Sequence, residues 1–367
     1  MRVSKTVLFI TPFTPDNQGV GVSYTSQLLK ELAKTCFVDL VYFRYAEDNP
    51  YSSPVPEIRV IREKIISGKD KLKSLIHSPF TFPLFTARYN KELCRFLQEQ
   101  VTKVKYDFVY FDFSQTFSYA KYIDHPDKIL MAHDVIAQKY SRMKTYLKPW
   151  AVMSERNMLK HGTVVFTFSE KDCKMMKDLY GINAMSTTFF LNPNVIKANP
   201  TTESDYFVFF GAWDRVENSD ALCWFMDNVY EHLSSDIQFK VIGGGKMPET
   251  LKNRIGQCNN IDYLGFVDDP YEIIANAKAE IAPLHMGAGV KVKCVEALGS
   301  GTPIIGTEVA FEGIGDKYSN AMFEANTADE YVKTISSFEF SLEDKKKLKD
   351  FFLANYNDKQ ILKYING

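Results

Sequence analysis

Two lysines, a glutamate and several glycines stand together in one short apolar stretch, GAGVKVKCVEALGSGTPIIGT at residues 287–307. Glycine lets a ligand approach the backbone closely, and the amides at a helix N-terminus suit a phosphate. Lys291 and Lys293 can add full positive charge to such a site. Glu296 can accept hydrogen bonds from two vicinal hydroxyls, such as those of a ribose. These residue types together predict a nucleoside-diphosphate site.

An ordinary surface role is the alternative for the same residues. Lys293 and Glu296 are three positions apart, and such a pair on a helix surface contributes about 0.2–0.5 kcal/mol. Gly299 and Gly301 fit a helix end and a turn better than ligand contacts. The occurrence of all the required types at one strand-loop-helix junction favours the ligand site over the surface pair.

The elements that would position this stretch alternate between strand and helix through the second half of the chain. The apolar runs have strand length, and the segments between them have helical spacing. Strands are expected at 206–212, 239–245, 261–267, 279–284 and 302–307, with helices near 219–234, 270–278 and 290–299. The glycine loop at 287–289 then lies where a strand passes into a helix.

The first half shows a similar alternation, which predicts parallel strands. The turn DNQGVGVS at 16–23 lies between a strand and a helix, so Gly21 is a candidate contact for a phosphate or an acceptor hydroxyl. Strands are expected at 5–11, 37–43, 106–112, 128–134 and 163–169, with helices at 23–35 and 169–181.

The chain loses its periodicity at 192–205, a stretch rich in proline and asparagine. We place the domain linker there. An N-terminal domain of about 1–190 and a C-terminal domain of about 200–350 are expected, and a helix at about 353–367 is a candidate to return to the first domain. Both are expected to be Rossmann-like doubly wound α/β domains that face each other across a ligand-binding cleft.

Composition excludes several other classes of protein. The 44 basic and 45 acidic residues give a formal charge of -1, which argues against nucleic-acid binding. The six cysteines are widely separated and lack the paired spacing of a metal site. No apolar run is long enough for a membrane-spanning helix, and the sequence predicts a cytoplasmic protein.

Several of these segments resemble retaining GT-B glycosyltransferases of family 4, the glycosyl transferases group 1. This large family includes many bacterial polysaccharide and lipopolysaccharide sugar transferases. The likeness runs from about residue 5 to about residue 330. It rests on VIGGGKMP, IDYLGFVDDPYEIIANAKAEIAPL, GAGVKVKCVEALGSGTPIIGT and FEGIG in the second half, and on TPFTPDNQGVGVSYTSQLLKEL, MAHDV and VVFTFSEKD in the first.

The resemblance implies a reaction and a division of labour. A sugar would pass from a nucleoside-diphosphate sugar to an acceptor hydroxyl with retention of configuration, in bacterial cell-surface polysaccharide or glycoconjugate biosynthesis. The first domain would hold the acceptor, and the second would hold the donor. In the family the leaving phosphate itself is thought to take the acceptor proton, so no protein nucleophile is expected.

The resemblance also implies roles for single residues. His133 in MAHDV would lie near the reacting sugar, and Lys291 would neutralise the leaving diphosphate, which makes these two the catalytic candidates. Glu296 matches the second glutamate of the family's E-x7-E pair, whereas Ala288 stands where the first is expected. The expected donor-binding residues are Gly21, Arg215, Gly243, Gly244, Phe266, Val267, Gly289, Val290, Lys291, Lys293 and Glu296.

No metal or other cofactor is expected, because Asp268 and Asp269 precede Pro270 and fit a helix start better than an ion site. The expected partners are the nucleotide-sugar donor and a glycan or lipid-linked glycan acceptor. Basic and aromatic residues interleave at 142–150, and a basic run precedes an apolar one at 71–85. Both stretches are candidates for peripheral contact with an anionic membrane, at the inner face of the cell membrane.

Two other functions stay open at this point. One is a sugar-nucleotide epimerase of the same architecture, and the other is a nucleotide-sugar-binding or glycan-binding protein without catalysis. Ala288 in place of a glutamate is compatible with the second.

Overall fold

The computed structural model describes residues 5–15, 20–68, 76, 78–142, 146–202, 205–357 and 359–367. Contacts divide the chain into two compact units. The N-terminal unit consists of residues 1–190 and 359–367, and the C-terminal unit of residues 191–358. A short helix, α8 (Pro193–Lys197), forms within the stretch expected to be the linker.

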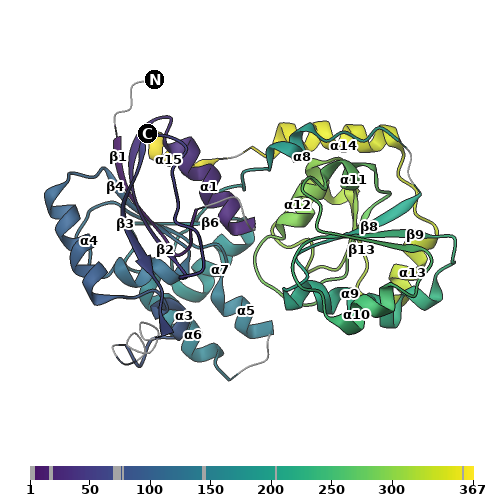
Figure 1. Cartoon of the computed structure of the whole chain (residues 1–367), viewed down its shortest axis with the longest axis horizontal. Helices are drawn as coiled ribbons and strands as arrows, with labels where there is room; N and C mark the ends of the chain where they lie inside the picture. Colours follow the sequence, from purple (N-terminus) through teal and green to yellow (C-terminus); the bar gives the residue numbers. More distant parts are fainter. Residues whose placement is uncertain are drawn as a thin grey trace. The chain divides into compact units, whose positions relative to one another are not determined.

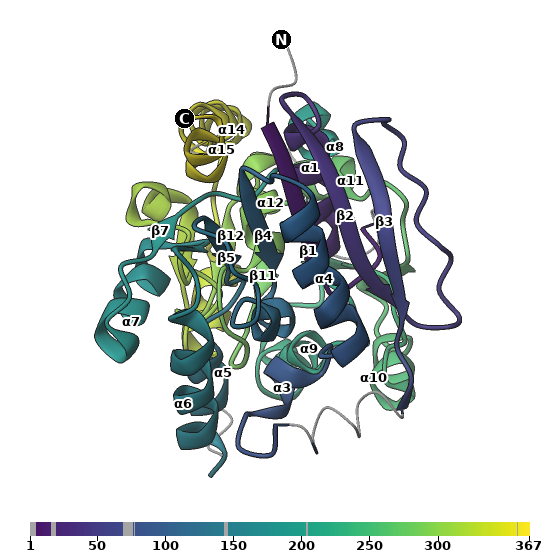
Figure 2. The same ribbon diagram turned by 90° about the vertical axis from the view of Figure 1, so that its left-hand side faces the viewer.

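The N-terminal unit is built on a seven-stranded parallel sheet in the order β3-β2-β1-β4-β5-β6-β7 (Figures 1 and 2). Its central strands are almost continuously apolar, because both faces of the sheet are covered. The strands are β1 (Lys5–Thr11), β2 (Cys36–Arg44), β3 (Ile58–Ile65), β4 (Phe108–Asp112), β5 (Lys128–Met131), β6 (Val164–Thr167) and β7 (Met185–Ser186).

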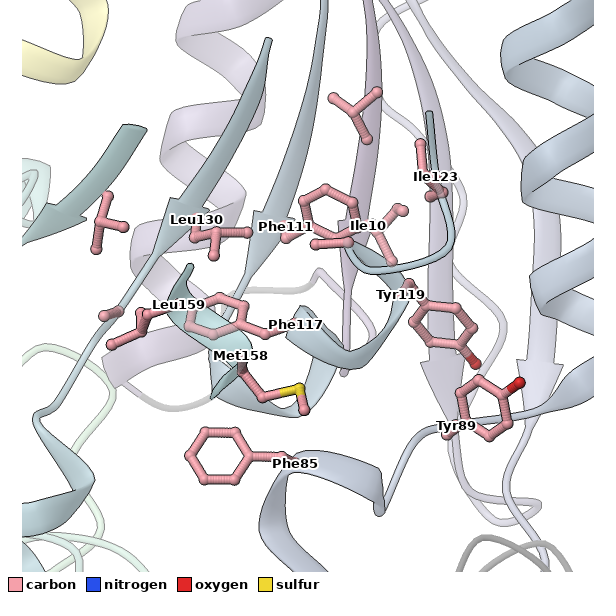
Figure 3. Packing of buried hydrophobic residues seen from close by; sticks show 14 of the residues in the cluster. Ile10, Phe85, Tyr89, Phe111, Phe117, Tyr119, Ile123, Leu130, Met158 and Leu159 are labelled. Atoms are coloured by element: carbon pink, nitrogen blue, oxygen red, sulfur yellow. The ribbon is translucent and has the colours of Figure 1, made fainter. Parts of the chain in front are cut away.

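The helices of this unit cover the sheet, and loops connect them to the strands. Among the described residues they are α1 (Val20–Leu32), α3 (Pro83–Thr86), α4 (Lys91–Lys103), α5 (Ile136–Arg142), α6 (Lys148–Leu159), α7 (Glu170–Tyr180), α15 (Gln360–Asn366) and the 3-10 helix η1 (Ser114–Tyr119). A hydrophobic core joins strands and helices of this unit. In it, the fully buried Ile10, Phe111 and Leu130 of three neighbouring strands belong to the same cluster as Phe117 and Leu159 (Figure 3).

Helix α7 follows its sequence signals closely. Ser169 accepts the backbone N–H of Asp172 at 3.0 Å and so caps the first turn. Gly181 ends the helix with φ 73°, in the left-handed region that glycine adopts without strain. The expected helix at 169–181 is confirmed.

The C-terminal unit has a six-stranded parallel sheet in the order β10-β9-β8-β11-β12-β13 (Figure 1). Its strands are β8 (Tyr206–Phe210), β9 (Gln238–Ile242), β10 (Ile261–Gly265), β11 (Glu280–Ala282), β12 (Ile304–Gly306) and β13 (Met322–Glu324). The helices are α9 (Val216–Asn228), α10 (Glu249–Ile255), α11 (Tyr271–Asn276), α12 (Val292–Gly299), α13 (Ala328–Ser336) and α14 (Leu342–Asn355), with 3-10 turns η2 (Tyr230–His232) and η3 (Asp316–Ala321).

The strand order of this sheet reverses between β8 and β11. From β8 the chain builds outward through β9 and β10, and from β11 it builds outward through β12 and β13. Loops at such a switch point diverge at the carboxyl edge of the sheet and leave room for a ligand. The two loops concerned are 211–215 and 283–291.

The helix expected at about 353–367 is two separate elements. Helix α14 ends at Asn355 in the C-terminal unit, and α15 begins at Gln360 in the N-terminal unit. The N-terminal unit holds the second piece by polar contacts. Thr35 Oγ1 donates to Asn366 Oδ1 at 3.0 Å, and Lys359 Nζ donates to Thr188 Oγ1 at 2.8 Å. Within the described ranges, no helix is both long enough and apolar enough to span a bilayer.

Candidate functional site

The glycine stretch forms the predicted strand-loop-helix junction between β11 and α12. Gly287 has φ 108° and Gly289 has φ 67°, both in the region where a side chain would strain the backbone. These two residues turn the chain from the strand toward the helix, and Val290 follows them. α12 begins at Val292, with Lys291 at its N-cap position. The junction therefore has the local geometry that the sequence predicts.

Lys291 folds back over this loop. Its Nζ donates to the carbonyl oxygen of Gly289 at 2.6 Å and lies 3.6 Å from Glu312 Oε2. The side chain is only 11% exposed, and so is removed from most of the surrounding water. The Glu312 carboxylate offsets part of the lysine charge, so an entering phosphate would compete with it for the ammonium group.

Lys293 connects the start of α12 to the loop after β8. Its Nζ donates to Asn218 Oδ1 at 3.1 Å, and Asn218 Nδ2 donates to the carbonyl oxygen of Ala212 at 3.0 Å. The amide of Asn218 therefore bridges the two loops of the switch point. Arg215 is the N-cap residue of α9 at the end of the same loop and is exposed. With Lys291, three cationic side chains thus belong to the elements that meet at the switch point.

Glu296 is buried and forms a hydrogen bond with a tyrosine hydroxyl. Its side chain is 8% exposed, and the hydroxyl of Tyr271 on α11 forms a hydrogen bond with it. The pKa of Glu296 is raised to about 8, chiefly by burial. The Tyr271 hydrogen bond opposes the rise, and the charge of Glu280 adds to it. A surface ion pair with Lys293 is therefore the wrong description, since Lys293 is bonded to Asn218.

Glu280 is a second buried acid that sequence reasoning missed. It lies in β11 with 1% exposure, and neither carboxyl oxygen has a hydrogen-bond partner within the described part of the chain. Burial raises its pKa to about 7, and the nearby Lys293 charge lowers it. Its one signal in the sequence is an acid within an apolar strand, AEIAPL.

A second glycine loop, Gly243–Gly245, follows β9. A Cβ at Gly243 would lie 1.7 Å from the carbonyl oxygen of Gly211, so only glycine fits there. Trp213 N donates to the carbonyl oxygen of Gly244 at 2.8 Å, which fastens this loop to the loop after β8. The loop at 211–215 therefore contacts both the Gly243–Gly245 loop and, through Asn218, the start of α12.

Phe266 lies beside this second loop. A Cβ on Gly244 would be 3.1 Å from its ring, and the phenylalanine is nevertheless 75% exposed. An exposed aromatic ring next to a bare backbone offers a surface on which a nucleobase can stack. Val267 follows it and is half-buried. The Nε1 of Trp213 is buried, with no hydrogen-bond partner among the residues that the structure describes.

In the N-terminal unit, His133 belongs to a hydrogen-bond network around the buried carboxylate of Asp112. The Nε2 of His133 lies 2.9 Å from Asp112 Oδ1 at the end of β4. The other oxygen of Asp112 accepts the hydroxyls of Thr11 at 3.0 Å and Thr25 at 2.6 Å. An ionised carboxylate only accepts hydrogen bonds, so His133 donates through Nε2 and, when neutral, presents Nδ1 as an acceptor.

Aromatic packing fixes the imidazole plane. The ring of Phe113 stacks on that of His133 with centroids 3.4 Å apart and an angle of 8° between the planes. Phe113 reaches this position with φ 58°, an uncommon backbone conformation for a non-glycine residue. Phe168 meets the imidazole edge-on at 5.0 Å. Sequence reasoning singled out His133 but missed Asp112 and Phe113, whose roles depend on contacts between strands.

Gly21 is the second residue of α1, and residues 16–19 of the predicted turn before it lie outside the described residues. Ala288 lies within the α12 loop and offers no carboxylate. Asp269 Oδ1 accepts the N–H of Tyr271 at 3.2 Å, which confirms its expected place at a helix start. In the described ranges, no cluster of three or more His, Cys, Asp or Glu side chains is arranged to hold a metal ion.

Comparison with known proteins adds a family match and a fold. Residues 204–338 match the model of a family described as glycosyl transferases group 1. This segment contains the Gly243–Gly245 loop and the whole α12 junction. No curated protein matches the chain in sequence.

Several solved structures are similar to the chain along almost its whole length. Sucrose-phosphate synthase from Thermosynechococcus elongatus is 13% identical, with a TM-score of 0.70, 96% of this chain covered and 95% of that one. HepE from Anabaena, in complex with UDP and glucose, is 11% identical, with a TM-score of 0.68 and coverage of 99% and 100%. WaaG, a glycosyltransferase involved in lipopolysaccharide biosynthesis, is 14% identical, with a TM-score of 0.64 and coverage of 95% and 95%.

At these identities the similarity establishes architecture. The expected fold class is confirmed, since two parallel α/β units in this arrangement along the chain are those of GT-B glycosyltransferases. The roles expected for single residues stay predictions. The chain thus has the GT-B fold of two Rossmann-like units, and residues 204–338 of its second unit match the glycosyl transferases group 1 model.

Proposed function

We propose that this protein transfers a sugar from a nucleoside-diphosphate sugar to an acceptor hydroxyl with retention of configuration. The observation that carries the proposal is the α12 junction. There a glycine loop, a helix N-terminus, two lysines and a buried glutamate occur within ten residues of chain, 287–296. The glycosyl transferases group 1 match covers the same residues.

The diphosphate would bind at the start of α12. The backbone amides of the loop and of the first helical turn would supply hydrogen-bond donors and partial positive charge. Lys291 and Lys293 supply two ammonium groups. The first contacts the carbonyl oxygen of Gly289 and the Glu312 carboxylate, and the second donates to Asn218 Oδ1. As the bond to the sugar breaks, negative charge grows on the diphosphate, and these fixed cations stabilise it. Arg215 is the third candidate cation.

The nucleoside would be held on either side of the diphosphate site. Glu296 would accept hydrogen bonds from the ribose hydroxyls, and such donors favour its ionised form against the burial that raises its pKa. Phe266 and Val267, with Gly243 and Gly244, would receive the base. The solved complexes of HepE with UDP support UDP as the first nucleotide to test.

His133 would serve the sugar and the acceptor. The Asp112 contact leaves Nδ1 as its acceptor atom, which suits a sugar hydroxyl. The leaving phosphate oxygen would take the proton of the acceptor hydroxyl, so the mechanism needs no protein nucleophile. The acceptor would be a glycan or lipid-linked glycan of a cell-surface polysaccharide or glycoconjugate. Ala288 removes one carboxylate from the sugar site, so donor selectivity would depend on other groups.

The test is turnover of a panel of activated sugars, measured as release of the nucleoside diphosphate. Lys291→Ala and Glu296→Ala should each lower turnover by about 100-fold or more, the loss typical of one charged group at a transition state. Lys252→Ala and Glu249→Ala are matched controls on α10, where both side chains are exposed. Unaltered turnover in both site variants would reject the proposal.

One observation, Ala288, favours a second candidate, a nucleotide-sugar-binding protein without turnover. Such a protein would be stabilised by the donor but would release no nucleoside diphosphate. An epimerase of the same architecture would change the donor sugar in the absence of any acceptor, and NMR of the donor would reveal the epimer. The same incubations therefore separate all three functions.

A further inference from the structure

Three large apolar side chains of the N-terminal unit are exposed around Trp150. Phe80 is 85% exposed, Tyr146 is 90% exposed and Met153 is 54% exposed. Trp150 Nε1 donates to the carbonyl oxygen of Phe80 at 2.7 Å, and Met153 lies about one helical turn beyond Trp150 on α6. Single exposed apolar residues are ordinary, but several around one position mark an interaction surface.

Buried and half-buried aromatic side chains pack beneath these exposed residues. The Phe82 ring is buried and meets the ring of Trp150 edge-on at 5.2 Å and that of Tyr140 at 4.8 Å. The backbone N–H of Phe82 donates to Ser154 Oγ at 2.8 Å. Helices α3, α5 and α6 lie together at the same end of the N-terminal unit (Figures 1 and 2). The exposed side chains are thus presented by packed elements.

The exposed charged side chains of α5 and α6 are basic. Lys139 on α5 and Lys148 at the start of α6 are exposed, and Lys148 Nζ donates to Ser141 Oγ at 2.8 Å across the two helices. The acidic residue within these two described helices is Glu155, which is 1% exposed. Its carboxylate accepts the N–H groups of Ile136 and Ala137 at the N-terminus of α5, at 3.0 and 3.1 Å. No carboxylate of α5 or α6 therefore faces solvent beside the lysines.

We propose that this surface docks the protein on an anionic lipid membrane. The surface consists of Phe80, Tyr146, Met153, Lys139 and Lys148, and we call it the anchor surface. Aromatic and apolar side chains partition into the headgroup boundary, while neighbouring lysines attract anionic lipid. The pairing of both kinds of group on packed helices fits a bilayer surface better than a pocket for a small ligand.

The anchor surface includes only part of the two stretches that the sequence predicts to contact a membrane. Residues 71–75, 77 and 143–145 of the two basic stretches lie outside the described residues and form no part of it. Docking goes beyond the proposed sugar transfer, and it would bring the protein to acceptors that are themselves held in a membrane.

Flotation of the full-length protein with lipid vesicles tests the proposal. Vesicles of phosphatidylcholine mixed with phosphatidylglycerol should carry the protein upward, and vesicles of phosphatidylcholine alone should carry much less. Added salt should weaken binding, because it screens the lysines. The double change Phe80→Ser with Met153→Ser should lower partition at least about tenfold, from the loss of apolar burial. Lys139→Gln with Lys148→Gln should lower it about 25-fold, at about fivefold per lysine.

Matched controls come from the same unit. Phe37→Ser changes a phenylalanine of β2 that is 53% exposed, and Lys91→Gln changes an exposed lysine of α4. Both controls should float like the unaltered protein. The proposal fails if the unaltered protein does not float, or if the controls lose as much binding as the anchor variants. It also fails if the anchor variants float normally but turn a dimer into a monomer in sedimentation, since the surface then joins two copies.

Failure of membrane docking and failure of the proposed sugar transfer are distinguishable. Flotation is measured without any donor, so a protein that transfers no sugar would still float. Conversely, stabilisation of the anchor variants by a nucleoside diphosphate should equal that of the unaltered protein, because the anchor surface contains no residue of the α12 junction.

Discussion

Replacement of Glu280 by glutamine should make the stability of the C-terminal unit less dependent on pH. Glu280 lies inside the sheet with 1% exposure, and its carboxyl oxygens lack hydrogen-bond partners among the described residues. Burial raises its pKa from 4.5 to about 7. Glutamine has nearly the same shape and does not titrate, so Glu280→Gln isolates the effect of the charge.

The sign follows from the direction of the pKa change. Because the folded-state pKa is the higher one, the unfolded chain loses its proton first as the pH rises. The stability associated with the protonated carboxyl is complete below pH 4.5 and is lost as the pH rises to about 7. At about 1.4 kcal/mol for each pH unit between the two pKa values, the loss is about 3 kcal/mol. The variant has no such loss.

Thermal unfolding followed by calorimetry between about pH 5 and about pH 8 measures this difference. The Tm of Glu280→Gln should rise relative to that of the unaltered protein by about 5–10 °C across the range, at about 2–4 °C per kcal/mol. Glu249→Gln, at an exposed position on α10, is the control and should show a constant difference. A constant Tm difference for Glu280→Gln, or one that favours the unaltered protein more at alkaline pH, would refute the reasoning.

Two further variants test the two units separately. Asp112→Asn should lower kcat by about 100-fold with a smaller change in the KM for the donor, because His133 loses the acceptor that fixes its tautomer and orientation. Steady-state kinetics would show this loss, and an unaltered kcat would mean that the contact is only structural. Gly243→Ala should destabilise the C-terminal unit by about 2–4 kcal/mol and weaken donor binding, because the new Cβ would lie 1.7 Å from the carbonyl oxygen of Gly211. Gly256→Ala is its control, since a Cβ there would lie 3.4 Å from the carbonyl oxygen of Lys252 and φ is -65°. Equal Tm values for the two alanine variants would contradict the prediction.

Local signals in the sequence predicted the elements that depend on local chemistry. Helix α7 begins and ends at the capping residues Ser169 and Gly181, whose hydrogen bonds are made within a few residues. The α12 junction was equally visible, because the glycines with positive φ at 287 and 289 lie between an apolar strand and a helix. Such features need no knowledge of distant parts of the chain.

Elements with mixed patterns were missed for a physical reason. Strand β3 reads IRVIREKI, and its charged side chains come from its place at the edge of the sheet, where one side is solvated. Helix α14 is rich in lysine, yet Lys345 and Lys349 are buried because each donates to backbone carbonyls of neighbouring segments. Composition alone indicates a solvated helix there.

The hydrogen-bond partners and the burial of each site residue were the features least predictable from the sequence. The bond of Lys293 to Asn218 spans 75 residues, and that of His133 to Asp112 spans 21. Glu280 has only the signal of an acid in an apolar strand, and its missing hydrogen bonds are a property of the packed sheet. The sequence therefore indicates which residues could act, whereas the fold determines which partners hold them.

A crystal structure of the full-length protein with UDP would test the central claim most directly. The account predicts the diphosphate within hydrogen-bond distance of the amides that open α12, with Lys291 or Lys293 turned toward it and Glu296 on the ribose hydroxyls. A nucleotide bound in the N-terminal unit, or an α12 junction that stays closed while UDP occupies another site, would contradict it.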